Sequence, residues 1–247
     1  MLNNIPSQVS EAEVLFINHS AGKDSQAMLA AVHKAGFKGK IVIVHADLGE
    51  MEWEPMHHFI EANSFGYEVH VVKPPMDFFQ LCKRYNRLPS GLARFCTSDL
   101  KTQPIGRFIK QYCRENGIKS AINCIGIRAE ESPARAKKEP FKLSKMSLKR
   151  EGIQVWEWYP IFDYKLNDVW NEIRSVGQEP HKLYSEGFSR LSCVFCVFGR
   201  KEEHQKAAKL RPELFQKMVQ LEKDLGKSIR LKTVNGQKVN QYLPEYI

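Results

Sequence analysis

Long apolar stretches are missing from this chain of 247 residues. A helix needs about 20 consecutive apolar residues to span a bilayer, and no stretch reaches that length, so we expect no membrane segment. Residues 1–6 lack a basic region followed by an apolar run, which argues against a signal peptide. We therefore expect a cytoplasmic protein, whose six cysteines are reduced thiols or metal ligands rather than a disulfide framework.

Acidic residues are too few to balance the basic ones. The chain has 37 Lys and Arg against 28 Asp and Glu, which gives a formal net charge of +9. Such an excess favours polyanionic partners, namely nucleotides, RNA or DNA, although a solvated basic surface produces the same count. Internal repeats and low-complexity tracts are also missing. The charge becomes informative only beside a nucleotide-binding motif.

Short apolar runs alternate with helical patterns along the chain. The first half predicts strands at 14–17, 41–44 and 68–72, with helices at 25–35 and 53–65 between them. This alternation is typical of an α/β fold, a parallel sheet with helices on both faces. The second half predicts the following: a helix at 99–116, a strand at 121–127, a polar surface loop at 130–150, a strand at 153–161, a helix at 168–176 and charged helices at 201–225.

The loop after the first strand carries the strongest local signal, Ser20-Ala21-Gly22-Lys23-Asp24-Ser25. A turn between a parallel strand and a helix is a common phosphate site, because the helix N-terminus offers N–H groups and partial positive charge. Gly22 allows close backbone approach, Lys23 adds a full charge, and Ser20 and Ser25 offer hydroxyl groups. The alternative is a chance turn of this composition.

A Walker loop is excluded by two positions. That motif requires glycine five residues before its Gly-Lys pair and Ser or Thr directly after the pair. Ile17 and Asp24 occupy those positions here. The loop instead resembles the PP-loop, Ser-Gly-Gly-x-Asp-Ser, with Ala21 replacing one glycine. This resemblance implies an adenine nucleotide α-hydrolase-like fold that binds the pyrophosphate part of ATP, with attack on the α-phosphate and Lys23, Asp24 and Ser25 as catalytic residues.

The resemblance continues over roughly residues 14–198. Asp47-Leu48-Gly49-Glu50, Arg94-Phe95-Cys96-Thr97 with Lys101, and the stretch 126–132 followed by Arg135 match further family segments. So does the closing stretch, 183–188 followed by Arg190, Ser192, Cys193 and Cys196. The chain thus resembles the phosphoadenylyl-sulfate reductase superfamily. Within it, the chain looks most like the ATP pyrophosphatase of DNA phosphorothioation systems and related phage proteins.

Three further nucleotide-site residues follow from this resemblance. It implies that Asp47 helps to hold Mg²⁺ or to orient the nucleotide, although Asp47 also suits a helix-capping turn. Arg128 and Arg135 suit phosphate or sulfate, because a guanidinium binds two oxygens at once; each arginine alone could equally be a surface charge. We expect Arg128 to be a functional surface group whose removal leaves thermal stability nearly intact.

Three cysteines are candidate metal ligands. The spacing of Cys193 and Cys196 brings two thiols within reach of one metal ion or cluster, and the resemblance adds Cys96. Adenylyl-sulfate reductases have two adjacent cysteines there and bind a [4Fe-4S] cluster, whereas this chain has Phe95 in the other position. The options are a cluster with three cysteine ligands, a cluster with another fourth ligand, a zinc site completed by His181 or His204, or three buried thiols. Cys82, Cys113 and Cys124 are expected in the core.

The sequence supports a PP-loop domain over 1–198 and a helical C-terminal extension over 199–247, packed on that domain. The predicted function is an ATP pyrophosphatase that adenylates an acceptor for sulfur transfer, with nucleic acid as candidate acceptor. A cysteine desulfurase or other modification-complex subunits are candidate partners. The alternatives are a sulfonucleotide reductase or a nucleotide-binding subunit of a larger complex. Such reductases carry a C-terminal Glu-Cys-Gly-x-His segment, and no cysteine follows Cys196 here, so we expect no reduction by that route.

Overall fold

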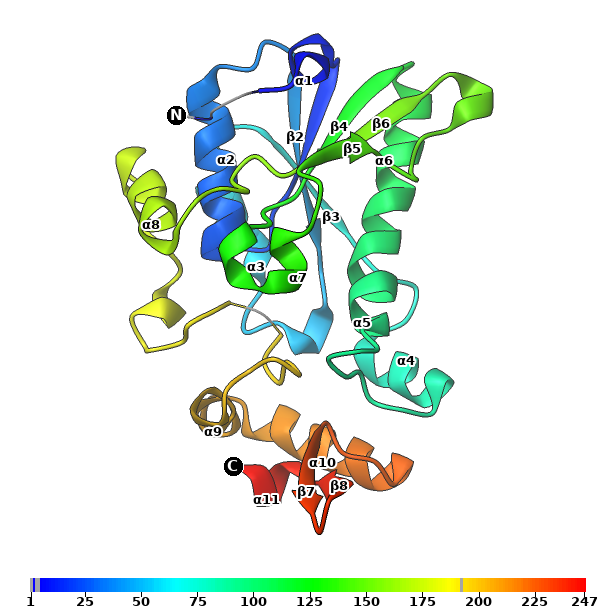
Figure 1. Cartoon of the computed structure of the whole chain (residues 1–247), viewed down its shortest axis with the longest axis vertical. Coiled ribbons are helices and arrows are strands. Elements are labelled where there is room, and N and C mark those ends of the chain that lie inside the picture. The colour runs from blue at the N-terminus through cyan, green and yellow to red at the C-terminus, as the bar shows by residue number, and fades with distance from the viewer. Residues whose placement is uncertain (1, 3–4, 192) are drawn as a thin grey trace. The chain divides into compact units, whose positions relative to one another are not determined.

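The computed structural model describes residues 2, 5–191 and 193–247, which form two units (Figure 1). The first unit comprises Met1–Ala46, Met56–Val72 and Ile105–Leu191, and the second comprises Asp47–Pro55, Lys73–Pro104 and Ser192–Ile247. Ser192, which matches the closing family stretch, and residues 1, 3 and 4 fall outside the described part. The predicted domain boundary at residue 198 places residues 47–55 and 73–104 in the first domain. In the structure these residues belong to the second unit.

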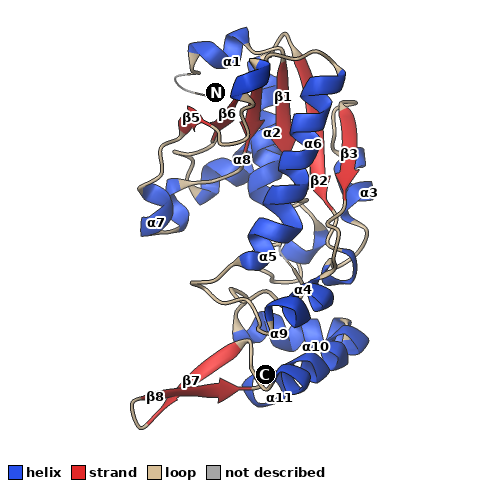
Figure 2. Cartoon of the chain, turned by 90° about the vertical axis from the view of Figure 1, so that its right-hand side faces the viewer, coloured by secondary structure: helices blue, strands red, loops and turns tan. Residues whose placement is uncertain are grey.

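A six-stranded sheet with the order β3-β2-β1-β4-β6-β5 forms the centre of the first unit (Figure 2). All neighbouring strands are parallel except β5 and β6. The predicted α/β class is therefore confirmed. The strands are β1 (Val14–Asn18), β2 (Lys40–Ala46), β3 (Glu68–Val72), β4 (Ser120–Cys124), β5 (Phe141–Leu143) and β6 (Gln154–Trp158).

Helices cover both faces of this sheet, because its strands have apolar side chains on both sides. On one face, Phe16 of β1 packs in a core cluster with Ile109 of α6 (Gln103–Glu115). Figure 1 shows α2 (Lys23–Ala35) on the opposite side of the sheet from α6. The remaining helices of the unit are α1 (Ser7–Glu11), α3 (Met56–Ala62), α7 (Pro133–Ala136) and α8 (Leu166–Ser175).

The prediction that residues 130–150 form a surface loop is wrong in part. It contains α7 and the edge strand β5, which pairs with β6 in antiparallel register, Phe141 opposite Trp158. Phe141 also stacks on Trp156, with ring centroids 5.0 Å apart. The stretch is rich in lysine and has few apolar anchors, so its own periodicity gives no strand signal. The pairing depends instead on β6, which follows it in sequence.

The second unit draws its core from all three of its stretches. Leu48, Phe95 and Met218 belong to one buried cluster. Its elements are α4 (Phe78–Tyr85), α5 (Phe95–Thr97), α9 (Lys201–Leu210), α10 (Pro212–Leu225), α11 (Leu243–Tyr246) and the strands β7 (Arg230–Val234) and β8 (Gln237–Gln241). The predicted break between the two long helices at Pro212 is confirmed.

The C-terminal region contains the helices α9, α10 and α11, and it also contains a β-hairpin that the prediction did not include. β7 and β8 form a separate two-stranded antiparallel sheet, visible in Figure 2. Asn235 and Gly236 join them with φ angles of 50° and 78°. An Asn-Gly pair with both φ angles positive is the preferred two-residue hairpin turn. The Asn-Gly pair is therefore the sequence signal for this hairpin.

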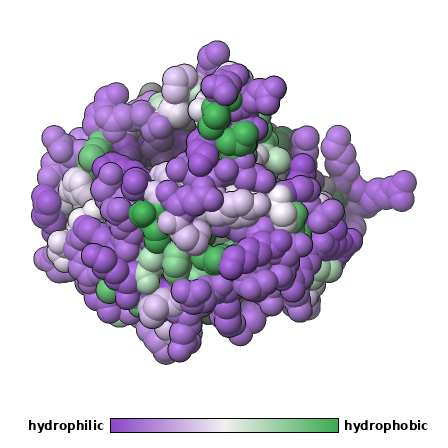
Figure 3. All heavy atoms as spheres, turned by 90° about the horizontal axis from the view of Figure 1, so that it is seen from below, coloured by the Kyte–Doolittle hydropathy of each residue, from purple (hydrophilic) through white to green (hydrophobic). Residues whose placement is uncertain are grey.

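The surface contains scattered apolar side chains, as in most proteins. Leu92 is fully exposed, and Leu231 is 58% exposed. The face drawn in Figure 3 is mostly hydrophilic, with small separate apolar patches. Among the described helices, none combines the length and the apolar character that crossing a membrane requires.

Glu222 fixes the hairpin and the last helix to α10. Its side chain is fully buried, and its carboxylate accepts the N–H groups of Ile229 at 2.8 Å and Leu243 at 2.7 Å. Burial raises the pKa of Glu222, while these two donors lower it. One buried side chain thus determines where the chain enters β7 and where α11 begins.

We expect Glu222→Ala to destabilise the second unit by about 2–5 kcal/mol, because two buried N–H groups lose their acceptor. Urea unfolding followed by circular dichroism measures this loss. Glu222→Gln keeps one acceptor oxygen and should lose less stability than Glu222→Ala. Glu202→Ala, at an exposed position on α9, is the matched control. Equal stability of the Glu222→Ala and Glu202→Ala variants would contradict this role.

Candidate nucleotide-binding site

The phosphate loop lies at the carboxyl end of β1, between two neighbouring strands. Asn18, the last residue of β1, donates from Nδ2 to the Oδ1 atom of Asn123 at 2.5 Å and to the carbonyl of Cys124 at 2.6 Å. The His19 N–H donates to the carbonyl of Val44 at 2.9 Å. These bonds fix the start of the loop to β4 on one side and to β2 on the other. The loop therefore begins from a rigid base.

Ala21 adopts a left-handed conformation, with φ of +59°. An L-residue pays about 1–2 kcal/mol there, and glycine does not, which is the physical reason for glycine in the PP-loop pattern. The Ala21 N–H donates to Nδ1 of His19 at 3.1 Å and so holds the strained turn. Burial, and then the neighbouring His45, lower the pKa of His19 to about 3. His19 is therefore a neutral acceptor at physiological pH.

Ser25 organises the loop from within. Its buried hydroxyl accepts the Ser20 N–H at 3.1 Å and donates to the carbonyl of Gly22 at 2.9 Å. Its one hydrogen is thus used inside the loop. Ser20 is exposed, and its Oγ lies 3.4 Å from that of Ser25. Of the two predicted hydroxyl groups, Ser20 is the one that solvent and a ligand can reach.

Asp24 joins the two cations of the site. Its Oδ2 lies 3.0 Å from Lys23 Nζ, and its Oδ1 accepts from Arg128 Nε at 2.6 Å. Arg128 also donates to Glu130 at 2.6 Å and to the carbonyl of Tyr164 at 3.3 Å. The structure therefore brings together Lys23, Asp24 and Arg128, three of the predicted residues.

Arg128 is only 4% exposed, so the prediction that it is a surface group is wrong. Its guanidinium is buried among two carboxylates and a backbone carbonyl. The motif identified the residue, but the residue pattern around it did not reveal its burial. Removing this side chain leaves the buried side of Asp24 without its partner, and such a loss affects stability as well as function.

Two glycines of the site have different surroundings. A Cβ added to Gly126 would lie 3.1 Å from the backbone carbonyl of Asp24 and 3.2 Å from the Ser25 nitrogen. The segment before Arg128 thus touches the first turn of α2, and a larger residue at 126 would fit only if the two backbones moved slightly apart. A Cβ added to Gly22 would make ordinary van der Waals contacts, with the Leu191 carbonyl and Ser20 Oγ at 3.5 Å and the Tyr184 hydroxyl at 3.6 Å. No clash explains the glycine at 22.

Tyr184 is a site residue whose role the sequence did not indicate. Its hydroxyl accepts the Lys23 N–H at 2.8 Å and the Leu191 N–H at 3.3 Å. Burial raises the pKa of Tyr184 to about 12. The residue lies in the closing family stretch, so the motif gave its position. Its contact with the first turn of α2 depends on the fold.

Arg135 and Asp47 have local partners. Arg135 forms an ion pair with Glu131, one helical turn earlier. Asp47 accepts the Gly49 N–H at 2.8 Å and lies 3.4 Å from Lys73 Nζ, all within the second unit. The Asp47 bond to the N–H two residues later forms an Asx turn just before the helical turn Gly49–Met51, whose N-cap is Leu48. Nucleotide or Mg²⁺ binding by these two residues stays a prediction.

The three candidate cysteine ligands all belong to the second unit. Burial raises the pKa of Cys96, and the Cys196 thiol raises it further. Burial likewise raises the pKa of Cys193, with Cys196 and Cys96 adding to the effect and Lys101 opposing it. The three thiols therefore influence one another. Cys82, Cys113 and Cys124 are fully buried, as expected for core residues.

The thiols do not form a preformed metal site. Among the described residues, no three His, Cys, Asp or Glu side chains are placed to hold one metal ion. His204, a candidate fourth ligand, has Nε2 2.9 Å from the carbonyl of Cys196, and burial lowers its pKa to about 4. His181, the other candidate, accepts the Leu183 N–H in the first unit. The arrangement of these side chains does not fit a cluster or zinc.

A parallel sheet with an anion-binding loop at the start of α2 defines a PP-loop nucleotide-binding domain. Residues 14–198 match the model of the phosphoadenosine phosphosulfate reductase domain, and the chain belongs to this family. The superfamily predicted from the motifs is therefore confirmed.

Relatives and solved structures extend the comparison. The chain is 32% identical to an uncharacterised 37.8 kDa protein of Escherichia phage 186, over 60% of this chain and 43% of that protein. It is 27% identical to an uncharacterised protein of Methanocaldococcus jannaschii, over 84% and 47%. The chain thus spans less than half the length of these relatives.

The similar solved structures include the phosphoadenylyl-sulfate reductase of Candida auris in its phosphate complex, with 14% identity, a TM-score of 0.47 and coverage of 74% of this chain and 82% of that one. Another is the NAD⁺ synthetase of Burkholderia pseudomallei, with 14% identity, a TM-score of 0.40 and coverage of 69% of each chain.

We expect Arg128→Ala to lower the free energy of unfolding by about 3–5 kcal/mol, because it removes a buried cation from Asp24 and Glu130 and leaves Asp24 with Lys23 as its remaining partner. Arg128→Lys keeps the charge but cannot bind both Asp24 and Glu130 as the guanidinium does. Its free energy of unfolding should therefore lie between that of Arg128→Ala and that of the parent protein. Thermal unfolding measures both. Exposed Arg107 gives the control variant Arg107→Ala. An unchanged melting temperature for Arg128→Ala would restore the interpretation of a surface group.

The left-handed turn predicts opposite outcomes for two substitutions of Ala21. Ala21→Gly relieves the backbone strain and should retain both stability and ATP affinity. Ala21→Val places a β-branched residue at a φ that such residues avoid, at a fully buried position. We expect the valine variant to lose more than tenfold in ATP affinity by calorimetry. Equal affinity of the two variants would show that the turn does not constrain the loop.

Proposed function

We propose that this protein is an ATP pyrophosphatase that adenylates an acceptor for sulfur transfer. The observation that carries the proposal is the loop 20–25, with its left-handed Ala21, Gly22 at the N-cap of α2 and Lys23 at the first position of that helix. This loop departs from the Walker pattern, and ATP bound by its β- and γ-phosphates leaves the α-phosphate for attack.

In the proposed reaction, an acceptor oxygen attacks the α-phosphorus of ATP. The bond from that phosphorus to the bridging oxygen breaks, and pyrophosphate leaves with the bond electrons. Lys23 and the N–H groups at the start of α2 stabilise the negative charge that develops on pyrophosphate. A thiol reductant releases the persulfide sulfur of the donor as hydrosulfide, which then attacks the activated atom of the acceptor. The bond from that atom to the adenylate oxygen breaks, and AMP leaves with the bond electrons.

Lys23 has to exchange partners in this scheme. It is paired with Asp24 in the structure, and Asp24 is also paired with Arg128. When ATP supplies negative charge, Lys23 turns to the phosphates while Arg128 keeps Asp24 in place. Asp24 thus acts as a positioning residue for both cations.

Mg²⁺ accompanies ATP and is held mainly by its phosphates and water, with one or two protein carboxylates. The half-exposed Asp47 carboxylate is the candidate for such a contact. No step of the proposed function uses an iron–sulfur cluster or zinc, because the described side chains do not fit either one.

Nucleic acid is the proposed acceptor. The net charge of +9 supports a polyanion, and the motif resemblance to DNA phosphorothioation proteins supports DNA. A cysteine desulfurase is the proposed source of sulfur. Two alternatives predict other activities: a sulfonucleotide reductase reduces adenylyl sulfate or its 3′-phosphate to sulfite, and a nucleotide-binding subunit binds ATP without turnover.

Pyrophosphate release by the purified protein tests the proposal. We expect Lys23→Ala to weaken ATP binding and pyrophosphate release roughly tenfold to a hundredfold, because a charge-assisted contact to phosphate is worth about 1.5–3 kcal/mol. Lys38→Ala removes an exposed lysine of the same unit and is the control. Unchanged affinity and turnover in a folded Lys23→Ala variant would refute the role of the loop.

The choice of substrate separates the alternatives. Parallel reactions contain ATP with duplex DNA, ATP with tRNA, or adenylyl sulfate with a thiol reductant. Pyrophosphate formed only with a nucleic acid supports the proposed acceptor. Sulfite formed from adenylyl sulfate supports the reductase instead.

A further inference from the structure

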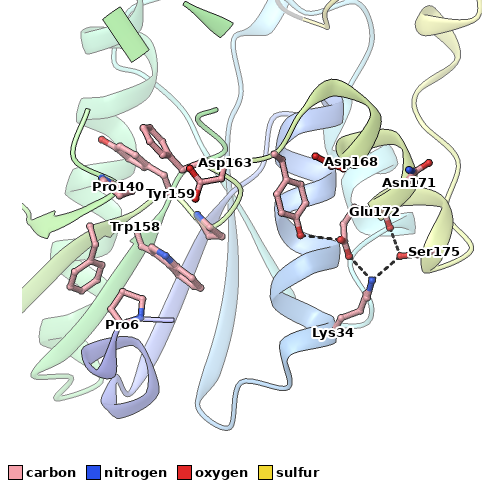
Figure 4. Close-up of a pocket in the computed structure, with 14 residues that line it drawn as sticks. Pro6, Lys34, Pro140, Trp158, Tyr159, Asp163, Asp168, Asn171, Glu172 and Ser175 are labelled. Carbon is pink, nitrogen blue, oxygen red and sulfur yellow. Dashed lines mark hydrogen bonds and ion pairs between the residues drawn. The ribbon is translucent and has the colours of Figure 1, made fainter. Parts of the chain in front are cut away.

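The first unit contains an aromatic and acidic groove separate from the phosphate loop (Figure 4). Its volume is about 600 Å³, within the usual range for ligand sites. Five aromatic residues and three prolines form most of its walls, together with three carboxylates and one lysine. None of the residues of the loop 20–25 lines it.

The aromatic wall comes from Phe141 of β5, from Trp158 at the end of β6, and from Tyr159, Phe162 and Tyr164 in the segment that follows β6. Side chains alternate along a strand, and Val155 packs in the cluster with α6, so Trp158 belongs to the opposite face of β6. Phe141 of β5 is the register partner of Trp158. Helix α8 supplies the facing wall through Asp168 and Glu172, which lie one helical turn apart. Figure 4 shows these two sets of side chains on either side of the groove.

Glu172 and Lys34 neutralise each other inside the groove. Lys34 Nζ lies 2.8 Å from Glu172 Oε1 and 3.0 Å from Ser175 Oγ. The Tyr164 hydroxyl donates to the other oxygen of Glu172 at 3.0 Å. The lysine is thereby held against α8. Its charge is compensated.

Two carboxylates are left without a cation. Asp163 is exposed and has no ion pair within the described part of the chain. Asp168 is also exposed; one of its oxygens accepts the Lys165 N–H at 2.7 Å, and no cation pairs with it among the described residues. The groove therefore has a local negative charge in a chain whose net charge is +9.

A guanidinium group fits this combination. It stacks on aromatic rings, is more weakly hydrated than an ammonium group and binds carboxylates through paired hydrogen bonds. We propose that the groove binds an arginine side chain presented by an extended segment of a partner protein. The remaining volume, between proline and aromatic walls, accommodates the residues that flank the arginine. This site does not depend on the proposed ATP chemistry.

Peptide binding tests the proposal. The probe is the blocked peptide Gly-Pro-Arg-Pro-Gly, and the matched control has citrulline, which is uncharged and nearly the same shape, in place of arginine. Calorimetry on the full chain should give binding of the arginine peptide that is at least tenfold tighter than that of the citrulline peptide. Equal affinities would overturn the proposal, and so would free arginine amide binding as tightly as the peptide.

Paired variants locate the site. The double variant with Asp163→Asn and Asp168→Asn should bind the arginine peptide at least tenfold more weakly. Its ATP affinity should be unchanged. Glu61→Gln combined with Glu115→Gln removes the same charge elsewhere on the first unit and should change neither. Each single Asp→Asn variant replaces the double variant if that one does not fold. Unchanged peptide binding in the folded Asp variants would overturn the assignment, whereas loss of pyrophosphate release in Lys23→Ala concerns the loop alone.

Discussion

The Asp24 carboxylate lies between two cations, Lys23 on one side and Arg128 on the other. This contact joins the first turn of α2 to the segment that follows β4. Glycine at position 126 favours it, because a Cβ there would come within 3.1 Å of the Asp24 backbone and the two segments would have to move slightly apart. Without Asp24, the two cations would repel each other before ATP arrived. The acid therefore keeps a positive site assembled while it is empty of phosphate.

The loop is stiff for a second, independent reason. Its internal hydrogen bonds use the hydroxyl of Ser25 and the imidazole of His19, which are buried, and the phenol of Tyr184, which is partly buried. Each of these groups is uncharged at neutral pH, because burial lowers the pKa of His19 to about 3 and raises that of Tyr184 to about 12. The framework of the loop is neutral, and its charge is confined to Lys23, Asp24 and Arg128. Ligand binding can therefore change the pairing of the charges without changing the loop.

Local patterns predicted most of the fold, and they failed where structure depends on distant residues. The strand at 68–72 and the glycine end of α2 agree with the structure, since apolar runs and a left-handed Gly36 act locally. The edge strand β5 did not follow from its own lysine-rich sequence, because its stability comes from β6. The same distinction holds at the site. The motif identified Lys23 and Arg128, but the burial of Arg128 and the contact of Tyr184 with α2 depend on chain segments more than 100 residues apart.

The core of the second unit combines residues 47–55, 73–104 and the last 55 or so residues of the chain. On the ribosome, chains emerge from the N-terminus, and domains fold as their residues become available. The sheet of the first unit is complete once Trp158 has emerged, whereas Leu48 and Phe95 must wait for Met218 of α10. Two apolar segments of the nascent chain thus lack their core partners until α10 has been synthesised. We expect these segments to be the parts most prone to aggregation during that period.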